Sequence, residues 1–371
     1  MLILGIESSC DETAAALVDG TGIVRSSTIA SQIDLHAEYG GVVPEIASRE
    51  HVARILPVVR SALADADARL TDIDAIAVSH RPGLVGSLLV GVAAAKALAW
   101  SLGVPLYAVD HVHAHLHAAF LRDADAGSHA STRATDAIER ACPALGLVVS
   151  GGHSTIYHIK SGLELERLGA TIDDAIGEAF DKAASILGLA YPGGPEIDRL
   201  ASLPNADDRL IDLPVSRLAK DSLDFSFSGL KTALLYQVNG VPKPRNRSGH
   251  PGDRAHEPVP EMTPERTRDL AACFQRAAIR AIELKLDRAA AHLDAHGVPI
   301  RALVAGGGVV ANSRLRAALQ TFAAGRDIAL HIPSLSYCMD NAAMIAGLGV
   351  ARHAAGTPDT LAVTPVPTTA C

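Results

Sequence analysis

The chain has 371 residues, of which 48% are hydrophobic, 20% are charged and 4% are aromatic. This composition is typical of a globular protein and excludes a fibre or a disordered chain. The length predicts two lobes, because a single hydrophobic core stops growing beyond roughly 250–300 residues. Aspartate and glutamate (41) outnumber lysine and arginine (33), which gives a formal net charge of −8. Any contact with nucleic acid must therefore use a local patch or a partner protein.

Five cysteines are scattered along the chain without a Cys-x-x-Cys pair, which argues against a disulfide framework or a cysteine zinc site. The apolar run in the amino-terminal sequence MLILGIESSCDE is too short for a signal peptide. The longest apolar stretch, residues 83–99, is interrupted by Ser87, Gly91 and Lys96. We therefore expect no membrane segment and a cytoplasmic location.

Two segments share one order of apolar run, small polar turn and second apolar run. The first is Leu2 to Val18 and the second is Leu145 to Ile159. Each is followed later by a predicted strand, a glycine-rich loop and a helix, at 73–86 and at 302–308. The repetition predicts two duplicated α/β lobes, and paired Ser/Gly-rich turns favour a nucleotide held between them. Each turn taken alone is also compatible with an ordinary hairpin.

Two polar segments are candidate boundaries or loops. Residues 123–142 are polar and rich in Ala and Ser and are interpreted as a linker or lobe boundary. Residues 239–262 contain five prolines and a basic cluster, Lys243, Arg245 and Arg247. An exposed loop is expected there, with RNA phosphates as one partner for the cluster and solvent as the alternative. Thr263 and Pro264 then predict the start of a long helix.

Four histidines alternate in the segment HVHAHLH (111–117). On a strand all four would share one face, whereas on a helix His111 pairs with His115 and His113 pairs with His117. The alanines and the leucine favour a helix. A histidine pair four residues apart can bind a transition metal with a third ligand from elsewhere, although this spacing also arises by chance on many helices.

Asp340 lies in SYCMDNAAM (336–344), directly before an alanine-rich segment that is predicted to be helical. Its carboxylate is a candidate third metal ligand, and an N-cap role is the alternative. Two histidines and one carboxylate would leave coordination positions open, as in a working metal site. No Glu follows His111 or His113, so the zinc-protease pattern His-Glu-x-x-His is absent.

Further polar groups lie in DDAIGEAFDK (173–182) and YPGGPEID (191–198). Carboxylates beside glycine turns can hold ribose hydroxyls, and a solvated helix face is the alternative. The pattern Gly306-x-Gly308-x-x-Ala311 formally matches the dinucleotide-binding pattern, but no further βαβ units follow it. A P-loop is excluded because the Gly-x-x-x-x-Gly-Lys-Ser/Thr motif is absent.

Taken together, these motifs resemble the TsaD-type tRNA N(6)-adenosine threonylcarbamoyltransferases, a family once called glycoproteases. The resemblance covers nearly the whole chain. Its segments are LGIESSCDET (4–13), HAEYGGVVPEIASREH (36–51), PGLVGSLLVG (82–91), 111–115, LVVSGGHS (147–154), IDDAIGEAFDKAASILGLAYPGGPEIDRLA (172–201), DFSFSGLKTA (224–233), GGVVANSRLR (307–316) and CMDNAAMIA (338–346).

The resemblance implies an α/β protein with two duplicated lobes of the actin-like (ribonuclease H-like) ATPase fold and an interlobe cleft. The amino-terminal lobe is expected over 1–122, with 336–371 packing back on it, and the carboxyl-terminal lobe over 143–335. One divalent metal ion, iron ahead of zinc, is expected at His111, His115 and Asp340. Threonylcarbamoyl-AMP is expected at Val148, Val149, Ser150, Gly151, Gly152, Asp181, Gly194, Asp198 and Asn312.

The reaction that this resemblance implies is acyl transfer in tRNA modification. The N(6) amine of the adenosine just 3′ of the anticodon, position 37, attacks the carbamoyl carbon and AMP leaves. ATP or AMP should fit the same cleft, and no residue is identified as a general base. The expected partners are tRNA, a paralogous scaffold subunit and a small ATPase of the bacterial pathway, with no membrane.

The chain departs from the family pattern at three places. Arg81 precedes Pro82-Gly83 where glycine is usual, His113-Ala114 replaces Glu-Gly, and Val310 replaces a serine. None removes an expected ligand, although Arg81 leaves the shape of its turn open. The alternatives are a small-molecule kinase or ATPase, a silent scaffold protein, a metalloprotease and a non-haem iron oxygenase. The histidine pair argues against the first, and the missing Glu argues against the metalloprotease.

Overall fold

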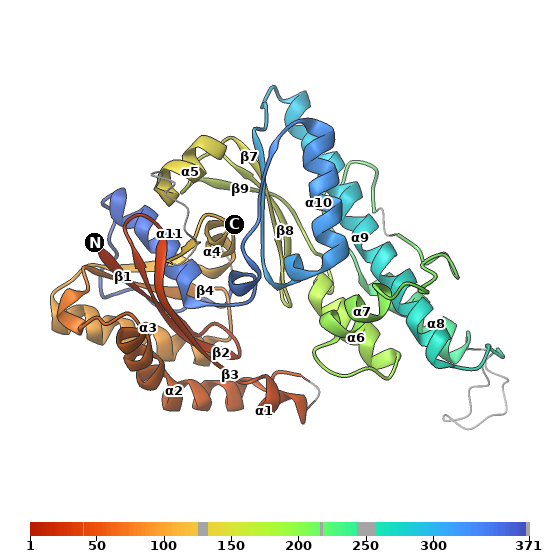
Figure 1. The fold of residues 1–371 in the computed structure, drawn as a ribbon, viewed down its shortest axis with the longest axis horizontal. Helices are drawn as coiled ribbons and strands as arrows, with labels where there is room; N and C mark the ends of the chain where they lie inside the picture. The colour runs from red at the N-terminus through yellow and green to blue at the C-terminus, as the bar shows by residue number, and fades with distance from the viewer. Residues whose placement is uncertain (40, 125–132, 216–217, 243–256, 369–371) are drawn as a thin grey trace.

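The computed structural model describes residues 1–39, 41–124, 133–215, 218–242 and 257–368. Two mixed β-sheets form the centres of two lobes (Figure 1). The strands of the first sheet are β1 (Leu2–Glu7), β2 (Glu12–Asp19), β3 (Ile23–Ser31), β4 (Ala75–Arg81), β5 (Leu106–Asp110) and β6 (Arg122–Asp123). Those of the second are β7 (Ala144–Val149), β8 (Ser154–Ile159), β9 (Leu165–Ala170), β10 (Ala302–Gly306) and β11 (Ala329–His331).

The two sheets repeat one topology. The first has the order β5-β4-β1-β2-β3-β6 and the second has the order β11-β10-β7-β8-β9. In each, an antiparallel meander of three strands is joined on its first strand by a parallel pair, β1 with β4 and β7 with β10. The duplication expected from the sequence is confirmed.

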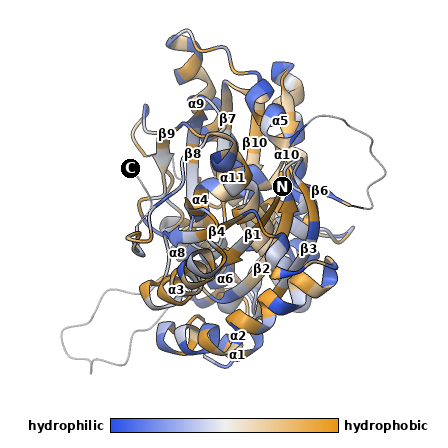
Figure 2. Ribbon diagram, turned by 90° about the vertical axis from the view of Figure 1, so that its left-hand side faces the viewer, coloured by the Kyte–Doolittle hydropathy of each residue, from blue (hydrophilic) through white to orange (hydrophobic). Residues whose placement is uncertain are grey.

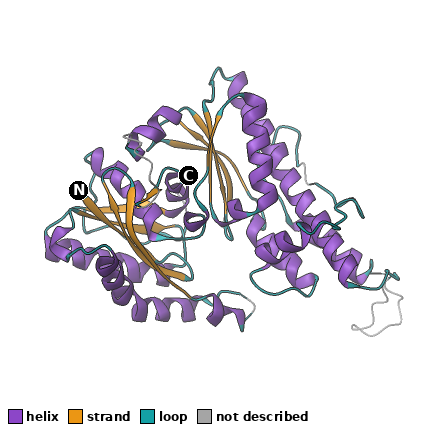
Figure 3. Cartoon of the chain, viewed as in Figure 1, coloured by secondary structure: helices purple, strands orange, loops and turns teal. Residues whose placement is uncertain are grey.

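Helices cover both faces of each sheet (Figure 3). The α-helices are α1 (Ile33–Ala37), α2 (Pro44–Asp65), α3 (Val85–Leu102), α4 (His111–Ala118), α5 (Ala134–Ala141), α6 (Ile176–Ile186), α7 (Gly193–Ala201), α8 (Ser228–Asn239), α9 (Pro264–Ala295), α10 (Ser313–Arg326) and α11 (Ala342–Ala354). The short 3₁₀ helices are η1 (Leu70–Asp72), η2 (Gly308–Ala311) and η3 (Leu335–Tyr337).

Strand alternation decides which helices cover which face of the first sheet. Leu4 and Ile6 point into a cluster with helices α2 and α3, whereas Ile3 points into a cluster with α11. Helix α4 contacts α11 on one side and strands β7 and β10 of the second sheet on the other. Helix α4, which carries the four histidines, is therefore enclosed between the two sheets.

Two helices expected from the sequence are confirmed. The helix over 111–117 is confirmed as α4, and Thr263 caps α9 by accepting a hydrogen bond from Arg266 N at 3.2 Å. Within 123–142, interpreted as a linker or lobe boundary, residues Ala134–Ala141 form helix α5, and its Ile138 and Ala141 are buried. The basic cluster Lys243, Arg245 and Arg247 lies outside the described residues.

Helix α3 is the one helix among the described residues that is long and apolar enough to cross a membrane. It packs against β4 and α2, as a core helix of a globular protein does. Its outward side remains strongly apolar, with Trp100 77% and Leu89 58% exposed.

Candidate functional site

A cavity of about 1640 Å³ opens between the two lobes. The first lobe lines it with the turn Ser9–Glu12, with Pro82 to Leu84 and with His111. The second lobe contributes the turn Ser150–His153 and parts of α6 and α7. Gly83 lets two turns of the first lobe meet, because a Cβ there would lie 2.4 Å from the carbonyl oxygen of Ser9. The paired turns predicted from the sequence thus face one cleft.

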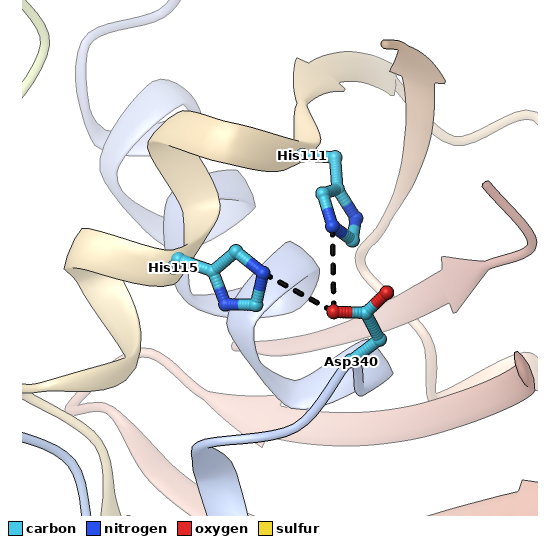
Figure 4. Close-up of side chains that lie close together, drawn as sticks. All are labelled: His111, His115 and Asp340. Atoms are coloured by element: carbon cyan, nitrogen blue, oxygen red, sulfur yellow. Dashed lines mark ion pairs between the residues drawn. The ribbon is translucent and has the colours of Figure 1, made fainter. Parts of the chain in front are cut away.

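His111, His115 and Asp340 come together (Figure 4), and His111 and Asp340 line this cleft. Asp340 Oδ1 lies 3.5 Å from His111 Nε2 and 3.2 Å from His115 Nε2. The three side chains offer ligand atoms that all lie within 4.8 Å of one another. Two imidazoles and one carboxylate are a suitable donor set for iron or zinc.

The local sequence explains why the two histidines face the same way. Asp110 ends β5 and caps α4, since its Oδ1 accepts hydrogen bonds from Val112 N at 2.9 Å and His113 N at 3.3 Å. Residues four apart on the helix that starts there share a face, so His111 and His115 point together. Arg81 Nε lies 3.3 Å from Asp110 Oδ2, so the residue that replaces the usual glycine contacts the capping carboxylate.

Glu7 fixes the orientation of His111. Its Oε2 accepts a hydrogen bond from His111 Nδ1 at 2.8 Å, and its Oε1 accepts from Ser79 Oγ at 3.0 Å. This arrangement leaves His111 Nε2 directed toward Asp340. A carboxylate on the far nitrogen of a histidine is the usual support for a metal-binding imidazole.

His115 shows that the site fits a metal ion. Its side chain is fully buried, yet neither ring nitrogen makes a hydrogen bond to a described residue, and Nε2 has only the ion pair with Asp340 Oδ1 at 3.2 Å. Burial lowers the pKa of His115, which favours the neutral imidazole that metals bind. A buried polar group without a partner is costly, and a metal at Nε2 would satisfy it.

His111 and Asp340 attract one another strongly. Burial works against charge on His111, but the carboxylates of Asp340 and Glu7 raise its pKa well above the usual value. Burial likewise opposes the charge of Asp340, but His111 and His115 hold its pKa well below the usual value. The carboxylate is therefore ionised, as a metal ligand must be.

The other two histidines of α4 have different surroundings. His117 is buried and its Nε2 donates to the carbonyl oxygen of Gly162 at 2.9 Å. His113 packs edge-on against Tyr157, with ring centroids 5.4 Å apart. Neither residue lines the cleft.

The N-cap role considered for Asp340 is wrong. The residue that caps α11 is Asn341, whose Oδ1 accepts a hydrogen bond from Met344 N at 2.9 Å. The helix begins at Ala342, one residue later than a cap at Asp340 requires. The Asp340 carboxylate is thereby free to point toward the two histidines.

Five of the residues expected to bind the nucleotide, at 148–152, lie at the end of β7 and in the turn that follows it. Ser150, Gly151 and Gly152 form the turn after β7 and line the cleft. Val148 and Val149 do not line it, because β7 is buried on both faces and their side chains belong to the hydrophobic clusters on either side of the sheet.

The remaining nucleotide candidates gather at the amino-terminal ends of α7 and α10. Asp181 Oδ1 accepts a hydrogen bond from Gly193 N at 2.7 Å, beside Gly194, and burial raises the pKa of Asp181. Asn312 caps α10 by accepting from Leu315 N at 3.0 Å. All three of Asp181, Gly194 and Asn312 line the cleft.

Asp198 is held by three donors from the protein. Ser313 Oγ and Gln275 Nε2 donate to its Oδ1 at 2.7 and 3.0 Å, and Ser313 N donates to Oδ2 at 3.0 Å. Asp198 also lines the cleft. A carboxylate has about four acceptor positions, so the fixed side chain retains capacity for one ligand hydroxyl.

Three residues of the site were not identified from the sequence. Glu7 lies in a strand, Gln275 is a buried polar residue among apolar positions of α9, and His153 ends the turn after β7. A polar residue at a core position is a signal that could have indicated Gln275. Glu7 follows an apolar run and His153 follows a Ser-Gly-Gly turn, so no spacing pattern marks either side chain.

The fold and the cleft define a class of protein: the two-lobed actin-like ATPase fold. HypF of T. kodakarensis aligns over 96% of this chain and 48% of its own at 14% identity, with a TM-score of 0.55. The (R)-2-hydroxyglutaryl-CoA dehydratase component A of Acidaminococcus fermentans aligns over 96% of this chain and 99% of its own at 13% identity, with a TM-score of 0.51. These likenesses support the fold expected from the sequence.

The particular family follows from sequence. The profile of the family described as TsaD, tRNA N6-adenosine threonylcarbamoyltransferase, matches residues 23–347. Proteins with that name are 46% identical in Sorangium cellulosum, over 100% of this chain and 97% of the relative, and 47% identical in Salinibacter ruber, over 98% and 99%. The chain belongs to the tRNA N6-adenosine threonylcarbamoyltransferase family.

The buried carboxyl group of Glu12 makes the stability of the protein depend on pH. Its side chain is 9% exposed, its Oε1 accepts from Ser31 Oγ at 2.8 Å and its buried Oε2 has no partner. Burial, aided by Asp11 and Asp340, raises the pKa of Glu12 to about 7 from 4.5. Ionising Glu12 therefore destabilises the folded state, with no effect below pH 4.5 and the full effect above pH 7.

We therefore expect Glu12→Gln to raise the free energy of unfolding by about 1–3 kcal/mol at pH 8 and by much less at pH 5. Urea unfolding at the two pH values measures the difference. The control is Glu196→Gln, because Arg199 lowers the pKa of Glu196 and its loss should slightly destabilise the protein at pH 8. Equal effects of Glu12→Gln at both pH values would contradict the burial argument.

Proposed function

We propose that this chain transfers the threonylcarbamoyl group of threonylcarbamoyl-AMP to the N(6) amine of adenosine 37 in tRNA. The observation that carries the proposal is the match to threonylcarbamoyltransferases over the full length of the chain. The interlobe cleft, with its turns and its histidine-carboxylate cluster, supports it. The enzyme is an acyltransferase of tRNA modification.

The adenylate would lie across the cleft, with its phosphate at the turn Ser150–Gly152 and its ribose beside Asp198. Backbone N–H groups in a Ser/Gly turn suit a phosphate. Asp198, held by Ser313 and Gln275, would accept a hydrogen bond from one ribose hydroxyl without moving. Pre-positioned groups of this kind lower the entropic cost of bringing the acyl group to the amine.

We further propose that His111, His115 and Asp340 hold one divalent metal, with iron preferred over zinc on the basis of the family resemblance. When bound, the metal supplies Lewis-acid polarisation of an oxygen of the acyl group. Glu7 keeps His111 in the orientation that binding requires. The lobe assignments, 1–122 with 336–371 and 143–335, belong to the same proposal, supported by the packing of α11 against β1, β2 and β4.

The metal assignment predicts a sharp division among the histidines of α4. His111→Ala, His115→Ala and Asp340→Ala should each lose the metal, since each removes one of three ligands. His113→Ala should retain it and stay stable, while His117→Ala should retain it but unfold more easily, because Gly162 O loses its donor. Elemental analysis of anaerobically purified variants measures occupancy and identifies the metal. Full occupancy in His111→Ala, or loss in His113→Ala, would show that the wrong face was assigned.

The transfer reaction itself is tested with purified components. The chain is incubated with threonylcarbamoyl-AMP, unmodified tRNA and the partner proteins, and the digested nucleosides are separated by mass spectrometry. We expect threonylcarbamoyladenosine with the wild-type chain and at least about 100-fold less with Asp340→Ala. Failure of the wild-type chain to modify tRNA under these conditions would refute the proposed activity.

A partner would cover the apolar face of α2 and α3, which pack against each other on the outside of the first lobe (Figure 1). Figure 2 shows the hydrophobic colouring of α3. The face presents Val52 and Leu56 from α2 with Val85, Leu89 and Trp100 from α3, each at least half exposed. Exposed apolar residues gathered on two neighbouring helices favour a protein interface. We propose that the paralogous subunit binds here, with the small ATPase as a further partner in the cytoplasm.

This interface predicts that Trp100→Glu weakens binding of the purified paralogous subunit at least tenfold, because a buried charge would replace a large aromatic contact. Leu163→Glu is the matched control, since Leu163 is an exposed leucine of the second lobe. Calorimetric titration measures both affinities. Unchanged affinity in Trp100→Glu would remove this face from the interface.

A further inference from the structure

His153 closes the turn that follows β7. Ser150 N donates a hydrogen bond to His153 O at 2.8 Å, and His153 N donates to Ser150 Oγ at 3.2 Å. These two bonds fix the backbone of the turn, and the imidazole lines the cleft. Its ring centroid lies 6.5 Å from that of His111, which belongs to α4. His153 therefore approaches the metal-binding cluster from the opposite lobe.

The imidazole of His153 makes no hydrogen bond to any of the residues that the structure describes. This distinguishes it from other histidines near the cleft. His51 bonds Thr13 and the carbonyl oxygen of Cys10, and His117 bonds Gly162. Those rings have structural partners inside the protein, whereas the His153 ring has no such partner among the described residues and belongs to a residue that lines the cleft.

The position of His153 would put its side chain close to the acyl group of a bound adenylate. It directly follows Ser150–Gly152, the proposed phosphate turn, and it faces His111. In threonylcarbamoyl-AMP the carbamoyl carbon is bonded to a phosphate oxygen. An adenylate with its phosphate at the turn and its acyl group toward His111 places the carbamoyl unit beside His153. No other histidine of the second lobe lines the cleft among the described residues.

We propose that His153 is a catalytic residue of the transfer, with a ring N–H that donates a hydrogen bond to the carbamoyl oxygen. In the reaction a bond forms between N(6) and the carbamoyl carbon, and the bond from that carbon to the phosphate oxygen breaks. AMP leaves with the electron pair, and N(6) releases one proton to water. Negative charge builds on the carbamoyl oxygen during attack, so a fixed donor there stabilises the transition state.

This inference rests on the proposed function. It adds that residues of both lobes must contact the same carbamoyl unit. The donor comes from the second lobe and the histidine-carboxylate cluster comes from α4 and the residue before α11. Both groups can contact one carbamoyl unit only when the lobes hold the spacing seen here. Neutral Asn keeps an N–H donor at the end of a shorter side chain, so it offers a partial substitute.

The experiment compares His153→Ala, His153→Asn and His113→Ala in the complete reaction with tRNA and partner proteins. We expect kcat to fall by about 100-fold or more in His153→Ala, the effect of removing one oxyanion donor, and to recover at least about tenfold of that loss in His153→Asn. Metal content and the Kd for AMP should stay within twofold of wild type, because AMP has no carbamoyl oxygen. His113→Ala, a histidine outside the cleft, should match wild type throughout.

Two results would overturn the inference while the proposed function stands. One is a wild-type kcat in His153→Ala. The other is a parallel loss of metal, AMP affinity and kcat, which would mean that His153 only supports the turn. If the wild-type chain itself failed to modify tRNA, the proposed function would be refuted and this inference with it.

Discussion

The close packing of helix α11 against strand β1 is the contact on which the site depends. Gly5 permits it, because a Cβ at that position would lie 2.2 Å from the carbonyl oxygen of Ala342 and 2.8 Å from Ala346 N. Gly349 does the same against Ala77, at 2.6 Å. All residues from Ala342 to Ala351 in this helix are buried. Because of this packing, Asp340, which lies near the end of the chain, lines the same cleft as Ser9, which lies near its beginning.

Several buried carboxyl groups lie near this contact. Glu7 and Asp340 both contact His111, and Glu12 lies nearby with one oxygen unpartnered. Grouped carboxylates destabilise a fold unless each has a partner. Such groups persist at sites where function requires them. The raised pKa of Glu12 and the unpartnered ring of His115 are consistent with a cleft shaped for ligands rather than for stability alone.

The nucleotide side of the cleft combines structural and binding roles in the same residues. Asn312 caps α10, Asp198 accepts from Ser313 at the start of that helix, and Asp181 holds Gly193 at the start of α7. Helix ends expose N–H groups that need acceptors. Because the side chains that satisfy them also face the cleft, the helices fix the geometry of the ligand groups. Gln275, from the long helix α9, adds a third donor to Asp198.

The sequence by itself determined the features that depend on local pattern. Alternation and turn residues predicted the duplicated hairpins, and the 3.6-residue period separated His111 and His115 from His113 and His117. Its motifs also indicated the family. The motif at 336–344 made Asp340 a candidate third ligand beside an N-cap alternative, and the resemblance selected the ligand role, since no local pattern relates residue 340 to residue 111.

Tertiary structure decided the contacts between distant residues. Glu7 and His111 are 104 residues apart, and Gln275 and Asp198 are 77 apart. Whether residue 340 or residue 341 caps α11 depended on where that helix could pack. The buried side of α5 likewise depended on its packing against strands β7, β8 and β10, which follow it in the sequence. Periodicity fixes which face of an element a residue occupies, whereas the neighbour of that face follows from packing the whole chain.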